Sequence, residues 1–167
     1  MENNRKFYSR KHIRLKSYDY SNSGFFFITI NIQKRLCLFG NIVDGIMVLN
    51  DAGRMIEKWY YELENKFPEK RCHEMVVMPD HFHCIIESTT VQHGQPSETI
   101  QNVIHWFKTM TTNEYIRGVK QYGWQRFDGK LWQRNFFDHI IRSEQSYIEK
   151  SEYIQNNPQN WRKSIKK

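Results

Sequence analysis

Residues 72–88, CHEMVVMPDHFHCIIES, contain the stretch of sequence that decides the fold. Apolar and β-branched residues dominate it, which favours a strand over a helix. Pro79 has no backbone N–H to donate to a sheet, so Met78-Pro79-Asp80 interrupts the strand pattern. The sequence allows two strands here or one bulged strand.

The residues before this stretch predict a strand and a helix. Residues 25–32, FFFITINI, are aromatic and β-branched and follow Ser23-Gly24, as expected for a buried strand. Asn50 is a good N-cap, and apolar residues then recur at helical spacing up to Pro68, which predicts a helix between these two residues.

The residues after it predict two further helices and a strand. Ser97 is expected to cap a second helix, and residues 118–130 to form a loop. Residues 131–142, LWQRNFFDHIIR, have strand composition, and Ser143 opens a last helix that should end at Pro158. The resulting order of strands and helices predicts an α+β sandwich, a largely antiparallel sheet with helices packed on it.

Length and composition limit the class of protein. The chain has 167 residues, of which 39% are hydrophobic and 15% aromatic, enough to form one folded domain. A (β/α)₈ barrel needs about 250 residues and is excluded. The net charge of +7 points to a polyanion, with nucleic acid as the first candidate partner. Three cysteines without a C-x-x-C spacing argue against a disulfide framework or a cysteine zinc site.

Location and domain limits follow from the same reading. No apolar run reaches the length of a membrane span, and no signal peptide is recognised, so we expect a cytoplasmic protein without a membrane partner. We expect a single domain at residues 23–161, between a basic arm at 1–22 and a basic tail at 162–167. The arm is either a solvated tail or a phosphate-contacting segment, with Arg5, Lys6, Arg10 and Lys11 as its candidate DNA contacts.

His81-Phe82-His83 is the sharpest chemical feature of the sequence. Side chains alternate across a strand, so the two histidines should project from one face and Phe82 from the other. Two imidazoles side by side can form half of a metal site, although an unrelated pair of hydrogen-bonded histidines fits the same spacing.

The last predicted helix carries a possible second half of that site. Tyr153 and Asn157 are one turn apart and share a helix face. The amide oxygen of Asn157 is a suitable ligand for Mg²⁺ or Mn²⁺. Tyrosine is a known covalent nucleophile and could attack a phosphate bound to the same ion. A core tyrosine followed by an Asn-Pro helix stop is the alternative interpretation, and Tyr147 is a lesser candidate nucleophile on a different face.

Four ordered blocks of the sequence resemble the REP-associated tyrosine transposases, members of the single-tyrosine transposases with a His-hydrophobic-His motif. The blocks span about residues 23–161. They are SGFFFIT at residues 23–29, MPDHFHC at 78–84, WQRNFFDHIIR at 132–142 and YIQNNP at 153–158, with Phe107-Lys108 at the place of a similar pair on the family's second helix.

The resemblance implies a fold, a reaction and a set of site residues. The fold would be a ferredoxin-like sandwich. Tyr153 would attack a phosphodiester in single-stranded or hairpin DNA of palindromic repeats, leaving a covalent 5′-phosphotyrosine and a free 3′-OH. His81, His83 and Asn157 would hold a divalent metal, Mg²⁺ or Mn²⁺, that assists cleavage and rejoining.

Several points stay open at this stage. Lys108, Arg134 and Arg142 are candidate DNA contacts, and Lys108 fits a solvated surface lysine equally well. The protein is expected to be a monomer or a homodimer and to associate with the nucleoid. The main alternative function is a non-catalytic DNA hairpin-binding protein of the same fold. Replication initiators and relaxases share the histidine pair and the tyrosine but order their motifs differently, and metal hydrolases with this histidine spacing usually need a larger barrel.

Overall fold

The structure is a computed structural model that describes residues 23–89 and 97–161. The predicted arm at 1–22 and tail at 162–167 lie outside the described residues. The elements in chain order are β1 (Gly24–Asn31), the short 3₁₀ helix η1 (Gln33–Arg35), β2 (Gly40–Val43), β3 (Ile46–Leu49), α1 (Asp51–Lys66), β4 (Lys70–Met78), β5 (His81–Ser88), α2 (Ile100–Tyr122), β6 (Phe137–Ile141) and α3 (Glu144–Asn160).

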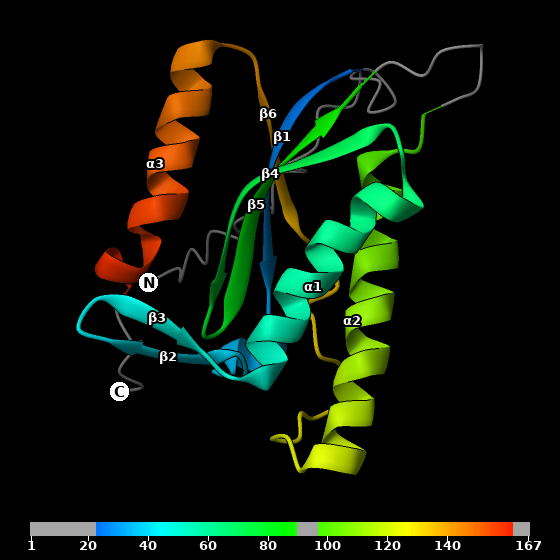
Figure 1. Cartoon of the computed structure of the whole chain (residues 1–167), viewed down its shortest axis with the longest axis vertical. Helices are drawn as coiled ribbons and strands as arrows, with labels where there is room; N and C mark the ends of the chain where they lie inside the picture. Colours follow the sequence, from blue (N-terminus) through cyan, green and yellow to red (C-terminus); the bar gives the residue numbers. More distant parts are fainter. Residues whose placement is uncertain (1–22, 90–96, 162–167) are drawn as a thin grey trace, which may run out of the picture.

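The main sheet, within the described residues, has four strands in the order β4-β5-β1-β6, and all its pairings are antiparallel. Helices α1 and α2 cover one face of this sheet, and α3 covers part of the other (Figure 1). This order and the two helical connections are those of the ferredoxin-like βαββαβ unit, so the predicted fold class is confirmed.

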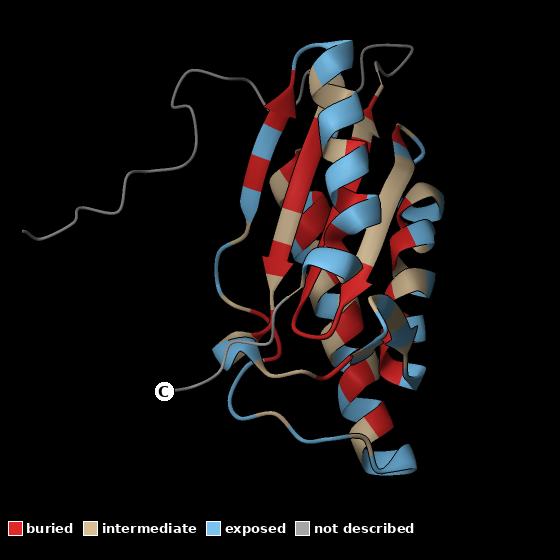
Figure 2. Cartoon of the chain, turned by 90° about the vertical axis from the view of Figure 1, so that its left-hand side faces the viewer, coloured by how far each residue is buried: buried red, intermediate tan, exposed pale blue. Residues whose placement is uncertain are grey.

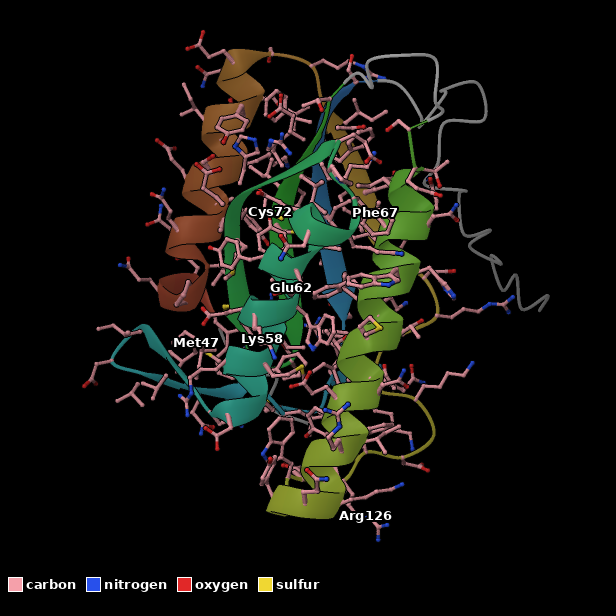
Figure 3. The ribbon with its side chains drawn as sticks, turned by 45° about the vertical axis from the view of Figure 1, so that its right-hand side comes forward. Met47, Lys58, Glu62, Phe67, Cys72 and Arg126 are labelled. Carbon is pink, nitrogen blue, oxygen red and sulfur yellow. The ribbon has the colours of Figure 1, made fainter. Side chains whose placement is uncertain are left out.

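The sheet has a core on each face, and the cores differ in size. Alternate residues of β1, among them Phe26 and Ile28, point towards α1 and α2 together with Phe82 and Cys84 of β5. Figure 3 shows the side chains that fill this layer, with Phe67 labelled at the end of α1. On the α3 face the buried cluster is small and consists of Phe27, Ile85, Ile141 and Ile154.

The stretch at residues 72–88, which is interrupted at Pro79, forms two strands, and β4 also contains a bulge. Pro79 and Asp80 make a tight turn between β4 and β5, and the register shifts between Cys72 and Met75. Of the two alternatives for the interruption at Pro79, the structure therefore has two strands, and the bulge in β4 lies elsewhere. The turn also brings Met78 opposite His81, so the end of β4 lies beside the histidine pair.

Three boundaries differ from the sequence prediction. The late strand is confined to Phe137–Ile141, because residues 131–133 bond to the end of β1 only through an isolated bridge and two backbone hydrogen bonds. The second helix is capped by Thr99 and continues to Tyr122. The last helix passes through Pro158, since a missing N–H in the final turn removes a single hydrogen bond.

The β2–β3 hairpin is an element that the sequence analysis missed. Asp44 and Gly45 at its turn have positive φ angles of 51° and 76°. An Asp-Gly pair between apolar residues is the usual signal for such a turn, because both central residues need left-handed backbone conformations. The signal was present in the sequence, and the strands on either side are only four residues long.

Gly118 provides a test of how tightly α2 packs against the loop that follows it. A Cβ atom added at this position would overlap the indole ring of Trp124. Ala is the better helix former by about 1 kcal/mol. We nevertheless expect Gly118→Ala to lower the free energy of unfolding by about 1–3 kcal/mol, because overpacking outweighs helix propensity. Urea denaturation measures the change, and the same substitution in a Trp124→Ala background should lose this penalty; an unchanged penalty there contradicts the packing explanation.

Candidate active site

His81 and His83 project from β5 towards the α3 face of the sheet, as their spacing predicted. Both are buried, with exposed fractions of 7% and 4%, and their ring centroids are 4.6 Å apart. Phe82 between them points into the core under α1 and α2. The register of β1 with β5 places Thr29 beside His83 and Asn31 beside His81.

His83 has one satisfied ring nitrogen and one that lacks a partner. Its Nδ1 lies 2.8 Å from Oγ1 of Thr29. Its Nε2 is buried and has no hydrogen-bond partner within the described part of the chain. Burial, with smaller effects from the charges of His81 and Arg35, lowers the pKa of His83 to about 3. The ring is therefore neutral at physiological pH, and a Thr29 bond donated by Nδ1–H leaves a lone pair on Nε2.

His81 is oriented by a carboxylate. Its Nδ1 lies 2.6 Å from Oδ1 of Asp80, and the other oxygen of Asp80 lies 2.9 Å from Nε of Arg35. Burial acts to raise the pKa of Asp80, but the hydrogen bond and charge of His81, with Arg35, outweigh it and lower this pKa. In metal sites a carboxylate often accepts the Nδ1–H of a histidine and so turns its Nε2 towards the metal.

Tyr153 lies directly against this pair from α3. Its ring centroid is 5.2 Å from that of His83 and 5.8 Å from that of Phe27, both in edge-to-face geometry. The side chain is nevertheless 51% exposed, so solvent or a ligand can reach the hydroxyl. This position suits the nucleophile role predicted for Tyr153, which stays a prediction.

The direction of α3 brings Asn157 to the level of His81. Tyr147, near the start of α3, contacts His73 and Phe25 at one end of the sheet, whereas Tyr153 contacts His83. The helix therefore runs antiparallel to β5. Asn157 lies about 6 Å further along the helix than Tyr153, which matches the spacing of about 6.6 Å from His83 to His81 along the strand. Asn157 is buried, with 8% of its surface exposed.

These residues fit a site for a divalent metal. The partnerless Nε2 of His83, the carboxylate-oriented His81 and the buried amide of Asn157 supply nitrogen and oxygen donors from two elements. In the parts of the chain that the structure describes, no three His, Cys, Asp or Glu side chains form a metal-binding group, and the buried amide of Asn157 stays the predicted third ligand.

Tyr147 occupies a different environment and does not meet the histidine pair. Its hydroxyl donates to Oε2 of Glu74 at 2.6 Å and lies 3.2 Å from Nδ1 of His73. His73 is in turn bonded to Glu87 at 2.9 Å. Burial and the hydrogen bond to Glu74 raise the pKa of Tyr147 to about 12. Tyr147 therefore lies with His73 and Glu74, and Tyr153 is the tyrosine of α3 that contacts His83.

The predicted DNA contacts fall in different places. Arg5, Lys6, Arg10 and Lys11 lie outside the described residues. Arg142 is exposed at the end of β6, on the side of α3. Lys108 and Arg134 lie away from the histidine pair, on the α2 side of the molecule, where they line a groove. The structure thus separates these last two residues from the candidate active site.

Three residues around the site were not among the sequence predictions. Thr29 and Asp80 orient the histidines, and the Nζ atom of Lys150 lies 5.0 Å from the ring centroid of Phe27, next to Tyr153. Asp80 directly precedes the histidine motif, which is a usable signal. Thr29 is identified only by the pairing of β1 with β5.

Fold and site together define an α+β protein with a histidine pair and a tyrosine on one face of an antiparallel sheet. The family described as "Transposase IS200 like" matches residues 48–157, more than half of the chain. The chain belongs to this family of IS200-like transposases, which confirms the resemblance found in the sequence motifs.

Two similar proteins come from Haemophilus influenzae. An "Uncharacterized protein" is 37% identical and covers 91% of this chain and 89% of its own length. A "Putative REP-associated tyrosine transposase" is 24% identical, covering 84% of this chain and 73% of its own length.

Two solved structures have a similar fold. One is the REP-associated tyrosine transposase bound to a REP hairpin, with a TM-score of 0.58 at 20% identity, covering 87% of this chain and 72% of that one. The other is a transposase from Deinococcus radiodurans, described as putative, with a TM-score of 0.51 at 16% identity, covering 86% and 95%. Among the described residues, none of the helices combines the length and the apolar character that crossing a membrane requires.

The two tyrosines of α3 should respond differently to loss of the hydroxyl. We expect Tyr147→Phe to lower the free energy of unfolding by about 1–2 kcal/mol, because it removes a hydrogen bond to a carboxylate. Tyr153→Phe should change it by less than about 0.5 kcal/mol, since that side chain is half exposed. Urea denaturation of both variants measures the difference, and equal losses would contradict the assigned environments.

Proposed function

We propose that this protein is a DNA strand transferase that cleaves and rejoins single-stranded or hairpin DNA through Tyr153. The observation that carries the proposal is the half-exposed Tyr153 ring, 5.2 Å from the ring of the buried, neutral His83. Membership of a transposase family supports the same reaction class.

The proposed reaction balances without a nucleotide cofactor. The phenolic oxygen of Tyr153 forms a bond to a backbone phosphorus, and the bond from that phosphorus to the 3′ oxygen breaks. The phenolic proton is transferred overall to the leaving oxygen, which gives a 5′-phosphotyrosine and a free 3′-OH. Attack by a 3′-OH on the phosphotyrosine reverses the step and joins a strand.

A divalent metal, Mg²⁺ or Mn²⁺, is proposed to bind at His81, His83 and Asn157. When bound, such an ion polarises the scissile phosphate and offsets the charge that develops on it. The contribution of this chain is to hold the two imidazoles in a fixed orientation, that of His83 through Thr29 and that of His81 through Asp80. Lys150, beside Phe27, adds positive charge where a phosphate would approach Tyr153.

The proposed substrate is a hairpin with an unpaired strand, as formed by palindromic repeats. A relative is named as a REP-associated tyrosine transposase, and a structure of similar fold is bound to a REP hairpin. The net charge of +7 suits a DNA partner. A cytoplasmic, nucleoid-associated location and a monomeric or homodimeric state remain predictions.

A covalent-adduct assay tests the proposed chemistry. Labelled hairpin DNA from beside the gene is incubated with the protein and Mg²⁺ or Mn²⁺, and the products are separated on a denaturing gel. We expect a band at the mass of protein plus DNA. Tyr153→Phe should remove this band and bind the hairpin with unchanged affinity, because only the nucleophilic oxygen is lost.

The matched control is Tyr147→Phe, which changes the same residue type on the same helix and should still form the adduct. An adduct formed by Tyr153→Phe would contradict the assignment of the nucleophile. Hairpin binding by the wild-type protein without any adduct, over a panel of hairpins, would favour the alternative function, a non-catalytic hairpin-binding protein.

Metal binding gives an independent test of the site. We expect His83→Ala to abolish Mn²⁺ binding measured by calorimetry, because a ligand is removed. Thr29→Val should weaken it about 10- to 100-fold, since only the orienting hydrogen bond is lost. His105→Ala, an exposed histidine on α2, serves as the control and should bind as the wild type does. Wild-type affinity in His83→Ala would contradict the proposed ligand set.

A further inference from the structure

A groove with a volume of about 730 Å³ lies between α2 and the segment 129–136 that leads into β6. It is on the α2 side of the sheet, away from Tyr153. Its cationic lining residues are Lys108 from the helix, and Lys130 and Arg134 from the segment, and His105 is also on its wall. Most of the other lining residues carry amide or hydroxyl groups.

The positive charge in this groove is not balanced locally. Among the described residues that line it there is no aspartate or glutamate. Two acids adjoin its ends, and both are engaged: Glu98 accepts a hydrogen bond from Asn102 at 2.8 Å, and Asp128 pairs with Lys34 at 2.6 Å. Burial, and then the charge of Lys130, lowers the pKa of Lys108 to about 8. A bound anion would relieve both effects.

The wall of the groove is held rigidly before any ligand arrives. The ammonium group of Lys108 donates to the carbonyl oxygens of Gln133 at 2.6 Å and Arg134 at 3.0 Å. The backbone N–H of Gln133 donates to the carbonyl of Asn31 at the end of β1, at 2.9 Å. The segment is thus fixed to α2 on one side and to the sheet on the other, which presents Arg134 without a large ordering cost.

The groove offers mainly charged and hydrogen-bonding groups, and its aromatic lining residues Trp132 and Phe136 are buried and half-buried against the core. Trp132 is 3% exposed and donates its indole N–H to Thr111, and Leu131 is 1% exposed. Unpaired nucleotides are usually bound by exposed aromatic rings on which bases stack. Cations and amides that outnumber the accessible rings, as in this groove, are instead suited to the phosphate backbone of a duplex.

The opposite face of the sheet has the complementary character. Phe137, the first residue of β6, is 39% exposed and pairs in register with Thr29, the partner of His83. Tyr153, which is also exposed, lies against that histidine. Segment 129–136 runs directly into β6, the edge strand of the described sheet (Figure 2). A DNA strand that leaves the groove can therefore pass over β6 towards Tyr153.

We propose that the groove between α2 and segment 129–136 binds the phosphate backbone of the paired hairpin stem, and that the unpaired strand crosses β6 to reach Tyr153. This inference rests on the proposed function, because it assigns a place to the duplex part of the proposed substrate. Contacts to the backbone carry no sequence information, so the groove sets the position of the stem and not its sequence.

The salt dependence of hairpin binding tests this assignment. Lys130→Gln with Arg134→Gln is made in the full-length Tyr153→Phe chain, so that no cleavage interferes. Each lost phosphate contact should reduce the slope of log K against log salt by about 0.9, hence by about 1.8 for the pair. At 0.1 M salt this corresponds to affinity weaker by roughly 50-fold, an effect that fades towards 1 M. Lys66→Gln, an exposed lysine of α1, is a single-charge control and should keep the slope.

Two DNA probes separate the stem from the unpaired strand. We expect the double variant to show the reduced slope on a hairpin with an unpaired tail, and also when the paired sequence of the stem is scrambled. It should show no change in slope on the tail alone. An unchanged slope, or an equal loss on the tail alone, would overturn the proposal. The adduct assay distinguishes failure of the proposed function: a wild-type protein that forms no adduct but shows the slope change retains the stem site without the chemistry.

Discussion

The antiparallel register between β1 and β5 is the constraint on which the candidate site depends. It places Thr29 beside His83 and Asn31 beside His81, and the alternation of side chains puts both histidines on the α3 face. A slip of one residue would turn the histidines into the large core under α1 and α2. The buried Phe26 and Ile28 of β1 oppose such a slip, because they would then leave that core.

Burial of the histidine pair explains why the surrounding residues have the roles they do. Burial keeps the imidazole of His83 neutral, so its Nε2, which has no partner among the described residues, can donate a lone pair to a cation. Thr29 and Asp80 fix the orientation of the two rings, and Arg35 stabilises the charge on Asp80. Tyr153 remains half exposed at the edge of this buried cluster, where a large substrate can reach it.

The partial coverage of the sheet by α3 gives its two faces different chemistry. Under α1 and α2 the sheet packs against a continuous core, and the groove beyond α2 is cationic and polar. On the α3 face the buried core is small, and β6 has exposed positions along its length (Figure 2). Phe137 is one of these exposed residues. A substrate with a paired and an unpaired part has a suitable surface for each, joined at the β6 edge.

Local patterns in the sequence determined the elements and the candidate chemistry: the strand at 25–32, the helix from Asn50 to Pro68, the alternation of His81-Phe82-His83 and the one-turn spacing of Tyr153 and Asn157. These patterns depend on the backbone periods of strand and helix, which a sequence carries. Tertiary structure alone decided that Tyr153, and not Tyr147, contacts the pair formed by His81 and His83. It also decided that Thr29 orients His83 and that Lys108 holds segment 129–136. Those contacts join residues far apart in the chain, so they depend on strand register and helix direction, which no local pattern specifies.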